Sequence, residues 1–355
     1  MDISDNELVT LMLCSELALN GELKPYSDAA YSAFAQALFL SGKQPSDLFN
    51  MSSQDIQEIC NAHTQLFTRI KRNDFAQCIP QLIKRHQQLF IELSTLEKEG
   101  IRVVTRADKA HYPAIIRRKF LSSGIPIPSL IYYSGDLSLV DSSKTVAMVG
   151  SRNLEKDTAA VKFTCDVVAK AVASGYAISS GGAKGVDGIA QDAALANGGR
   201  CVISVADSLS KKIKQADIRH AIVNRNCVFM SLVHPRQRFV SYNAMARNKL
   251  IYAASQYAIV VSCEYQTKMV NEKEAIDNNK GGTWTGAHEC VKKHLSELIV
   301  RSCSENMPRG NVELINTLPC RIICEQDLSQ NKSFDEILGA LRMQNINTAS
   351  QQTGR

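Results

Sequence analysis

Two short loops combine glycine, hydroxyl and cationic side chains, and they are the first candidates for chemistry in this sequence. One is Gly150-Ser151-Arg152, directly after the apolar residues 145–149, and the other covers residues 180–185, after residues 176–179. Glycine lets a backbone approach a ligand closely, hydroxyl and N–H groups donate hydrogen bonds, and arginine makes a two-pronged contact to an anion. A glycine turn that only joins a strand to a helix has the same sequence, and this alternative stays open. The phosphate-binding candidates are Gly150, Ser151, Arg152, Ser180, Gly181, Gly182 and Lys184.

Neither loop has the spacing of a nucleotide-cofactor site. Both lack the GxGxxG fingerprint of dinucleotide-binding folds and the GxxxxGK[ST] pattern of NTP-binding loops. We therefore expect no cofactor, and we assign no catalytic residue.

A third glycine-bearing segment, residues 281–287, reads Gly-Gly-Thr-Trp-Thr-Gly-Ala. Gly281 and Gly282 at the start of a predicted helix suit an anion. Trp284 is the only tryptophan of the chain, and its ring offers a platform on which a base or sugar stacks. The alternative is a tryptophan that fills the core.

Basic residues are concentrated between Ser208 and Lys249. These 42 residues contain nine lysines and arginines and one acid, Asp217, whereas the whole chain has a formal net charge of only +6. Such a run is typical of a surface that faces a polyanion, although a solvated loop can have the same composition. Lys211 and Lys212 are candidate contacts on this ground.

Arg247 and Asn248 are the last candidates, and we expect them to open an apolar helix that continues through Leu250 and Ile251. Basic charge is unfavourable at a helix N-terminus. Its presence at this predicted helix start therefore favours a phosphate partner.

The elements that must position these loops alternate between strands and helices. Short β-rich runs lie at residues 101–105, 129–134, 145–149, 176–179, 201–205, 227–232, 257–263 and 298–301, and helices are predicted over residues 158–173 and up to Ala196. This alternation predicts an α/β, Rossmann-like fold, whose mostly parallel sheet carries helices on both faces. Ligands of such sheets bind directly after the strands, where both glycine loops lie.

The chain divides into three parts. Helical periodicity of apolar residues predicts a small all-helical N-terminal domain over residues 1–95. Residues 96–342 form the predicted Rossmann-like domain, and residues 343–355 form a polar C-terminal tail.

The composition is that of a globular protein, with 45% hydrophobic and 21% charged residues in 355. No apolar run approaches the ~18 residues of a membrane span, and the first five residues are acidic where a secretory signal is basic. We expect a cytoplasmic protein without a membrane partner.

Cysteine usage argues against a disulfide framework. The 11 cysteines are odd in number and scattered singly. Only Cys320 and Cys324 are closely spaced, in an apolar run that is typical of buried thiols, so we assign no metal.

The order of the motifs resembles the DNA-processing protein A (DprA/Smf) family, within the Rossmann-like SLOG superfamily. The resemblance covers about residues 95–342 and rests mainly on residues 145–152, 180–187 and 247–251. It implies a domain that binds single-stranded DNA, usually as a homodimer, and helps to load a RecA-type recombinase during DNA uptake. It also implies no covalent chemistry. The implied DNA contacts are Gly150, Ser151, Arg152, Gly181, Gly182, Lys184, Arg247 and Asn248.

Several positions depart from the family pattern, so the chain is a divergent member. Gln191 replaces a usual histidine, Leu232 a usual glutamate, and Lys249 a usual arginine. The role therefore stays open between DNA uptake, recombination and defence.

The alternative function is a sensor of a nucleotide-derived small molecule, or an enzyme acting on one. Phosphoribohydrolases of the same superfamily carry a Pro-Gly-Gly-x-Gly-Thr-x-x-Glu loop, which residues 281–289 faintly resemble. His288 occupies the position of the glutamate, and Glu289 lies one place late. Because a catalytic carboxylate needs accurate placement, this departure argues against hydrolysis.

Overall fold

The structure is a computed structural model that describes residues 3–19, 21, 23–70, 74–154, 157–264, 267–270, 273–276, 281–329 and 331–344. Most of the predicted polar tail, residues 345–355, lies outside the described residues.

The N-terminal part is helical, as its periodicity predicts. It consists of α1 (Asp5–Cys14), α2 (Asp28–Leu40), α3 (Ser53–Ala62), α4 (Phe75–Ile83) and α5 (His86–Lys98), with 3-10 turns η1 (Pro45–Phe49) and η2 (Thr64–Leu66). Ser4, Ser27 and Ser52 cap α1, α2 and α3 by accepting hydrogen bonds from backbone N–H groups of the first turn.

A sheet of nine strands forms the centre of the molecule. The strands are β1 (Arg102–Thr105), β2 (Leu130–Gly135), β3 (Thr145–Gly150), β4 (Ala177–Ser180), β5 (Arg200–Val205), β6 (Cys227–Ser231), β7 (Tyr257–Ser262), β10 (Glu297–Arg301) and β11 (Arg321–Ile323). Their order is β1-β2-β6-β5-β4-β3-β7-β10-β11, and every neighbouring pair from β6 to β11 is parallel. Only β2 runs antiparallel to its neighbours β1 and β6. The Rossmann-like, mostly parallel sheet is therefore confirmed.

Helices cover both faces of this sheet because successive strand residues point to opposite sides. In β3, Val146 and Met148 join one core cluster, while Ala147 and Val149 join the other. The first cluster includes residues of α7 (Thr158–Ala173), α8 (Val186–Ala196), α9 (Leu209–Lys212), α10 (Ala216–Val223), α14 (Glu325–Ser329) and α15 (Phe334–Ala340). The second includes residues of α6 (Ala114–Ser122), η3 (Leu137–Asp141), α11 (Ser241–Ala253), α12 (Gly282–Lys292) and α13 (Arg309–Thr317).

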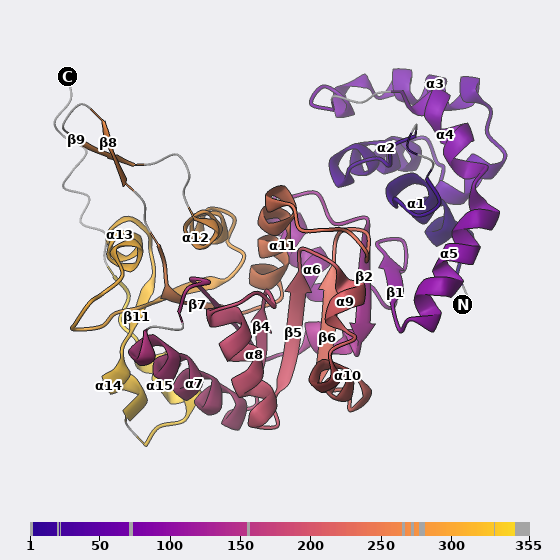
Figure 1. Ribbon diagram of the computed structural model, residues 1–355. Helices are drawn as coiled ribbons and strands as arrows, with labels where there is room; N and C mark the ends of the chain where they lie inside the picture. The colour runs from indigo at the N-terminus through magenta and orange to yellow at the C-terminus, as the bar shows by residue number, and fades with distance from the viewer. Residues whose placement is uncertain are drawn as a thin grey trace, which may run out of the picture.

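The N-terminal helices lie together beside the β1 edge of the sheet (Figure 1). Their apolar residues belong to the same core cluster as Ile101, Leu130 and Tyr132. Because this core is continuous, the domain boundary near residue 95 stays a prediction.

Three strands were not predicted from the sequence. The antiparallel pair β8 (Thr267–Val270) and β9 (Lys273–Ile276) lies in a stretch that reads as a polar insertion. The short strand β11 lies within residues 320–324, which were predicted only as an apolar run.

The thiols of that run differ in burial. Cys320 is 1% exposed, whereas the half-buried Cys324 donates from Sγ to Oδ2 of Asp327 at 3.1 Å. Across the described ranges, no group of three or more His, Cys, Asp or Glu side chains is placed to hold a metal ion. In the part of the chain that the structure describes, no helix is both long and apolar enough to span a membrane.

Candidate nucleic-acid interface

A pocket opens at the carboxyl edge of the sheet, between the loops that follow β3, β4 and β5. Its volume is about 400 Å³. The lining residues are Arg152, Asn153, Gly181, Gly182, Ala183, Lys184, Ala206, Asp207, Lys212, Phe239 and Arg247. Four of them are cationic and one, Asp207, is acidic, so the pocket suits an anion. The structure thus brings together Arg152, Gly181, Gly182, Lys184, Lys212 and Arg247, six of the residues singled out in the sequence.

Arg247 is the most deeply placed of these cations. Its side chain is only 6% exposed, and its Nη1 lies 3.6 Å from Oδ2 of Asp187 in α8. Among the described residues, its Nε and Nη1 have no hydrogen-bond partner. Both nitrogens are buried and do not face the pocket, so the guanidinium lines it with the small part of its surface that stays exposed and adds positive charge there.

The charges of Arg247 and Asp187 support each other. Burial lowers the pKa of Arg247, and the neighbouring carboxylate of Asp187 counteracts that shift. Burial likewise raises the pKa of Asp187, and the guanidinium of Arg247 counteracts it. The pair therefore keeps a cation in a site where an isolated charge would be costly.

Gly181 forms the surface on which this guanidinium lies. A Cβ atom at Gly181 would be 1.3 Å from Nη1 of Arg247 and 2.4 Å from Oδ2 of Asp187. Only glycine leaves room for the pair. Beside it, Lys212 donates from Nζ to the carbonyl oxygen of Gly182 at 2.5 Å, so α9 supports the same loop.

The other candidate residues of the two loops hold neighbouring elements of the sheet edge together. At Gly150, a Cβ atom would be 2.4 Å from Cγ2 of Val186, so this glycine lets α8 approach β3. The Ser151 hydroxyl donates to Oε1 of Glu264 at 2.5 Å and accepts from the backbone N–H of Asn153 at 3.1 Å. Ser180 is fully buried and bonds to backbone carbonyl oxygens. Gly150, Ser151 and Ser180 therefore do not line the pocket.

The expectation that Arg247 opens its helix is wrong. Helix α11 begins at Ser241, so Arg247 lies in its middle and the argument from the helix dipole does not apply. The helix start carries no side-chain cap, which removes the usual sequence signal. Asn248 points elsewhere and donates to the carbonyl oxygen of Gly282 at 3.3 Å.

The third glycine segment also lies outside the pocket. Gly281 and Gly282 are exposed at the start of α12, and neither lines the cavity. Trp284 is 6% exposed and belongs to the core cluster beneath α11 and α12. The base-stacking role expected for Trp284 is therefore corrected, because the ring fills the core. Lys211 is exposed but does not line the pocket either.

Phe239 is one of five pocket residues that were not candidates in the sequence, with Asn153, Ala183, Ala206 and Asp207. It is 47% exposed, and Cζ of Arg152 lies 5.1 Å from its ring centroid. An exposed phenylalanine in a loop has no periodic neighbours, so its place beside Arg152 follows only from the fold. It supplies an aromatic face at the mouth of a cationic pocket.

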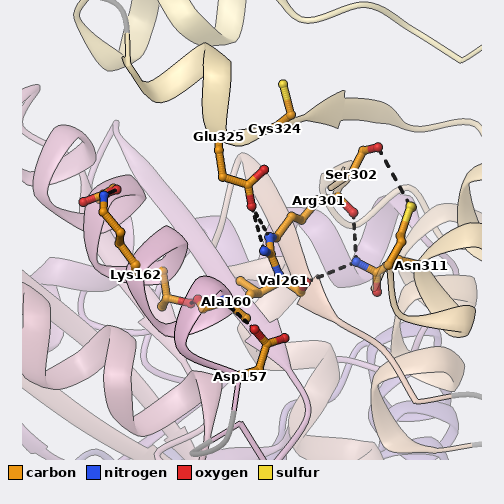
Figure 2. A network of polar contacts seen from close by, with 12 residues as sticks. Asp157, Ala160, Lys162, Val261, Arg301, Ser302, Asn311, Cys324 and Glu325 are labelled. Atoms are coloured by element: carbon orange, nitrogen blue, oxygen red, sulfur yellow. Dashed lines mark hydrogen bonds and ion pairs between the residues drawn. The ribbon is translucent and has the colours of Figure 1, made fainter. Parts of the chain in front are cut away.

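A buried amide fixes the loop after β7, which brings Glu264 to Ser151. Asn311 of α13 accepts from the N–H of Cys263 at 2.7 Å. It donates to the carbonyl oxygens of Val261 at 3.1 Å and Arg301 at 2.9 Å (Figure 2). It joins β7 and β10 just beyond their last ladder pair, Val260 with Val300. Nearby, Arg301 donates from Nε and Nη2 to Oε1 of Glu325 at 2.9 and 2.7 Å (Figure 2).

Comparison with known proteins places this architecture in a family. The DprA of Streptococcus pneumoniae is 29% identical over 148 residues, 41% of this chain and 51% of that protein. The DprA of Bacillus subtilis is 24% identical over 212 residues, 59% of this chain and 66% of that protein. The chain thus matches less than two thirds of the length of either relative.

The fold agrees with a solved structure as well. The X-ray structure of DprA from Streptococcus pneumoniae superposes with a TM-score of 0.61 at 19% identity, covering 96% of this chain and 99% of that one. The family model of the DNA recombination-mediator protein A matches residues 102–322, more than half of the chain and nearly the whole sheet. This chain belongs to the DNA recombination-mediator protein A family.

Proposed function

We propose that this protein is a DNA-processing protein that binds single-stranded DNA by its sugar-phosphate backbone. The binding site is the pocket after β3, β4 and β5, and Arg152, Lys184 and Arg247 contact successive phosphates. Its affinity depends steeply on salt and little on base sequence, because phosphates carry the interaction.

The four cations gathered round one pocket are the observation that carries this proposal. Arg152, Lys184, Lys212 and Arg247 come from separate segments of the chain, and Asp207 is the one acidic lining residue, so the pocket favours a polyanion. Family membership points in the same direction, since the family is named for mediating DNA recombination.

Phe239 favours a nucleic acid over a simple inorganic anion. Its half-exposed ring lies at the pocket with Arg152 beside it, so a base or sugar can stack where the phosphate is held. Stacking on an aromatic ring tolerates any base, since every base has a π-face.

We propose a binding protein rather than a nucleotide hydrolase. Glu289, the nearest counterpart of the hydrolase glutamate, forms an ion pair with Lys249 at 3.2 Å. His288, at the expected position of that glutamate, contacts the carbonyl oxygen of Trp284 through Nδ1 at 3.0 Å. Neither side chain lines the pocket.

In the cell, we propose that the protein acts in the cytoplasm as a homodimer and hands single-stranded DNA to a RecA-type recombinase. The process it serves is DNA uptake, recombination or defence. These roles follow from the family likeness rather than from any contact in the pocket.

The binding proposal is tested by fluorescence anisotropy with a labelled oligo-dT of a few tens of nucleotides. Arg152→Ala is expected to weaken binding about tenfold or more, because it removes a charge-assisted contact. Arg69→Ala, which removes the same charge from an exposed site away from the pocket, is the matched control and leaves affinity unchanged. A wild-type protein that does not bind oligo-dT at low salt contradicts the proposal.

A further inference from the structure

Large apolar side chains are exposed in one short stretch beside the pocket. Thirteen such side chains are exposed in the part of the chain that the structure describes, and four of them lie within seven residues. These four, Phe239, Val240, Tyr242 and Met245, are named here the α11 patch. A concentrated apolar patch usually marks a binding surface.

Tyr242 is the most exposed member of the patch. Its side chain is 77% exposed in the first turn of α11, and Met245 follows three residues later with 48% exposure. Residues three apart are neighbours on a helix surface, so the ring and the thioether lie side by side. Neither belongs to a core cluster, so packing does not account for their type.

The patch continues directly from the pocket. Phe239 belongs to both, and Tyr242 follows it by three residues, which limits the distance between their Cα atoms to about 11 Å. A strand held at Phe239 can therefore reach Tyr242 without a break.

The charge around the patch fits a polyanion. No aspartate or glutamate occurs between Asp217 and Glu264, a stretch that contains the whole patch. Arg238 is exposed immediately before Phe239, and Arg152 lies against the ring of Phe239. A stretch rich in cations and without acids favours a nucleic acid over an apolar protein partner.

We propose that Tyr242, with Met245 beside it, forms a second base-binding position for single-stranded DNA. The nucleotide next to the one held at Phe239 stacks on the Tyr242 ring, and the strand leaves the pocket over the start of α11. This inference rests on the proposed function, because it extends the same DNA path.

The test compares two oligonucleotides of twelve units, one of thymidines and one of abasic residues with the same backbone. Tyr242→Ala is expected to weaken binding of the thymidine strand at least about fivefold and to leave the abasic strand unaffected. Tyr242→Phe keeps the ring and restores binding. Phe39→Ala, which removes an equally exposed ring on α2, is the matched control and changes neither affinity.

Photo-crosslinking gives a second readout. Single 5-iododeoxyuridines placed along the thymidine strand are expected to crosslink to Tyr242 of the wild-type protein. The inference is overturned if Tyr242→Ala leaves the thymidine affinity unchanged, weakens both strands equally, or changes the oligomeric state by light scattering. If Arg152→Ala weakens both strands while Tyr242→Ala does nothing, only this inference fails. If the wild type binds neither strand, the proposed function fails with it.

Discussion

Gly181 and Arg247 are 66 residues apart in the chain, yet each fixes the place of the other. The sequence indicated both as phosphate-binding candidates, because glycine after a strand and a cation at an expected helix start are local signals. Their contact is not local: the guanidinium lies where a Cβ of residue 181 would be. Phe239 is exposed and Trp284 is buried, and residue type alone does not reveal this difference.

Replacing Gly181 by alanine is expected to displace the guanidinium of Arg247 from the pocket. Binding of oligo-dT weakens about tenfold or more, and stability falls by about 1–3 kcal/mol because the site is overpacked. The matched control is Gly282→Ala, where an added Cβ meets no atom within 4 Å. Anisotropy and urea unfolding measure the two effects, and wild-type affinity in Gly181→Ala would refute the role assigned to Arg247.

At the scale of elements, the strands were easier to predict than the start of α11. Residues 145–149 and 201–205 are apolar runs bounded by turn residues, and both became central strands. Helix α11 starts among exposed residues without a side-chain cap, and its buried residues are mainly at its end, Leu250 to Ala253. Its first turns therefore carry neither a cap nor a periodic apolar face. The residues of β8 and β9 form no comparable apolar run in the sequence.

Asn311 is expected to be essential for joining β7 to β10. Asn311→Ala removes three hydrogen bonds in a fully buried site and leaves one backbone N–H and two carbonyl groups without that partner. We expect a loss of about 3 kcal/mol or more in the free energy of unfolding, measured with urea. Val312→Ala, at the neighbouring partly exposed position, should change it by less than about 0.5 kcal/mol. Equal stabilities of the two variants would show that the amide does not hold the strands.

The ion pair between Glu99 and Arg236 tethers the segment that leads to Phe239. Nη2 of Arg236 lies 2.8 Å from Oε1 of Glu99, and this hydrogen bond holds the pKa of Glu99 below its ordinary value of 4.5. Because the pKa of Glu99 is lower in the folded state, the ion pair stabilises the fold fully above the unfolded-state pKa. This stabilisation is lost as the pH falls through the folded-state pKa.

Glu99→Gln is therefore expected to lower the melting temperature at neutral pH and to approach the wild type as the pH falls through the folded-state pKa of Glu99. The effect stays within about 1 kcal/mol, because both partners are partly exposed. Glu97→Gln, at an exposed position in the last turn of α5 just before Glu99, serves as the control. A difference between wild type and Glu99→Gln that persists unchanged at acid pH would contradict the assignment.

At the scale of the whole molecule, the α/β class and the position of the ligand edge could be predicted from strand and helix alternation. The docking of the N-terminal helices could not, because it depends on contacts between distant residues. Asp28 accepts from the N–H of Ser129 at 2.7 Å, and Arg106 donates to Ser32 at 2.6 Å while lying over the ring of Tyr31. No local sequence pattern predicts these contacts between residues that are far apart in the chain.

The central claim is that cations at one edge of the sheet hold the backbone of single-stranded DNA, and the salt dependence of binding tests it most directly. With three phosphates contacted, the logarithm of the binding constant should fall with the logarithm of salt with a slope of about −2. Arg152→Ala should make that slope shallower by about 0.7, and Arg69→Ala should leave it unchanged. A slope near zero, or one that Arg152→Ala does not alter, would contradict a backbone-binding pocket at the loops after β3, β4 and β5.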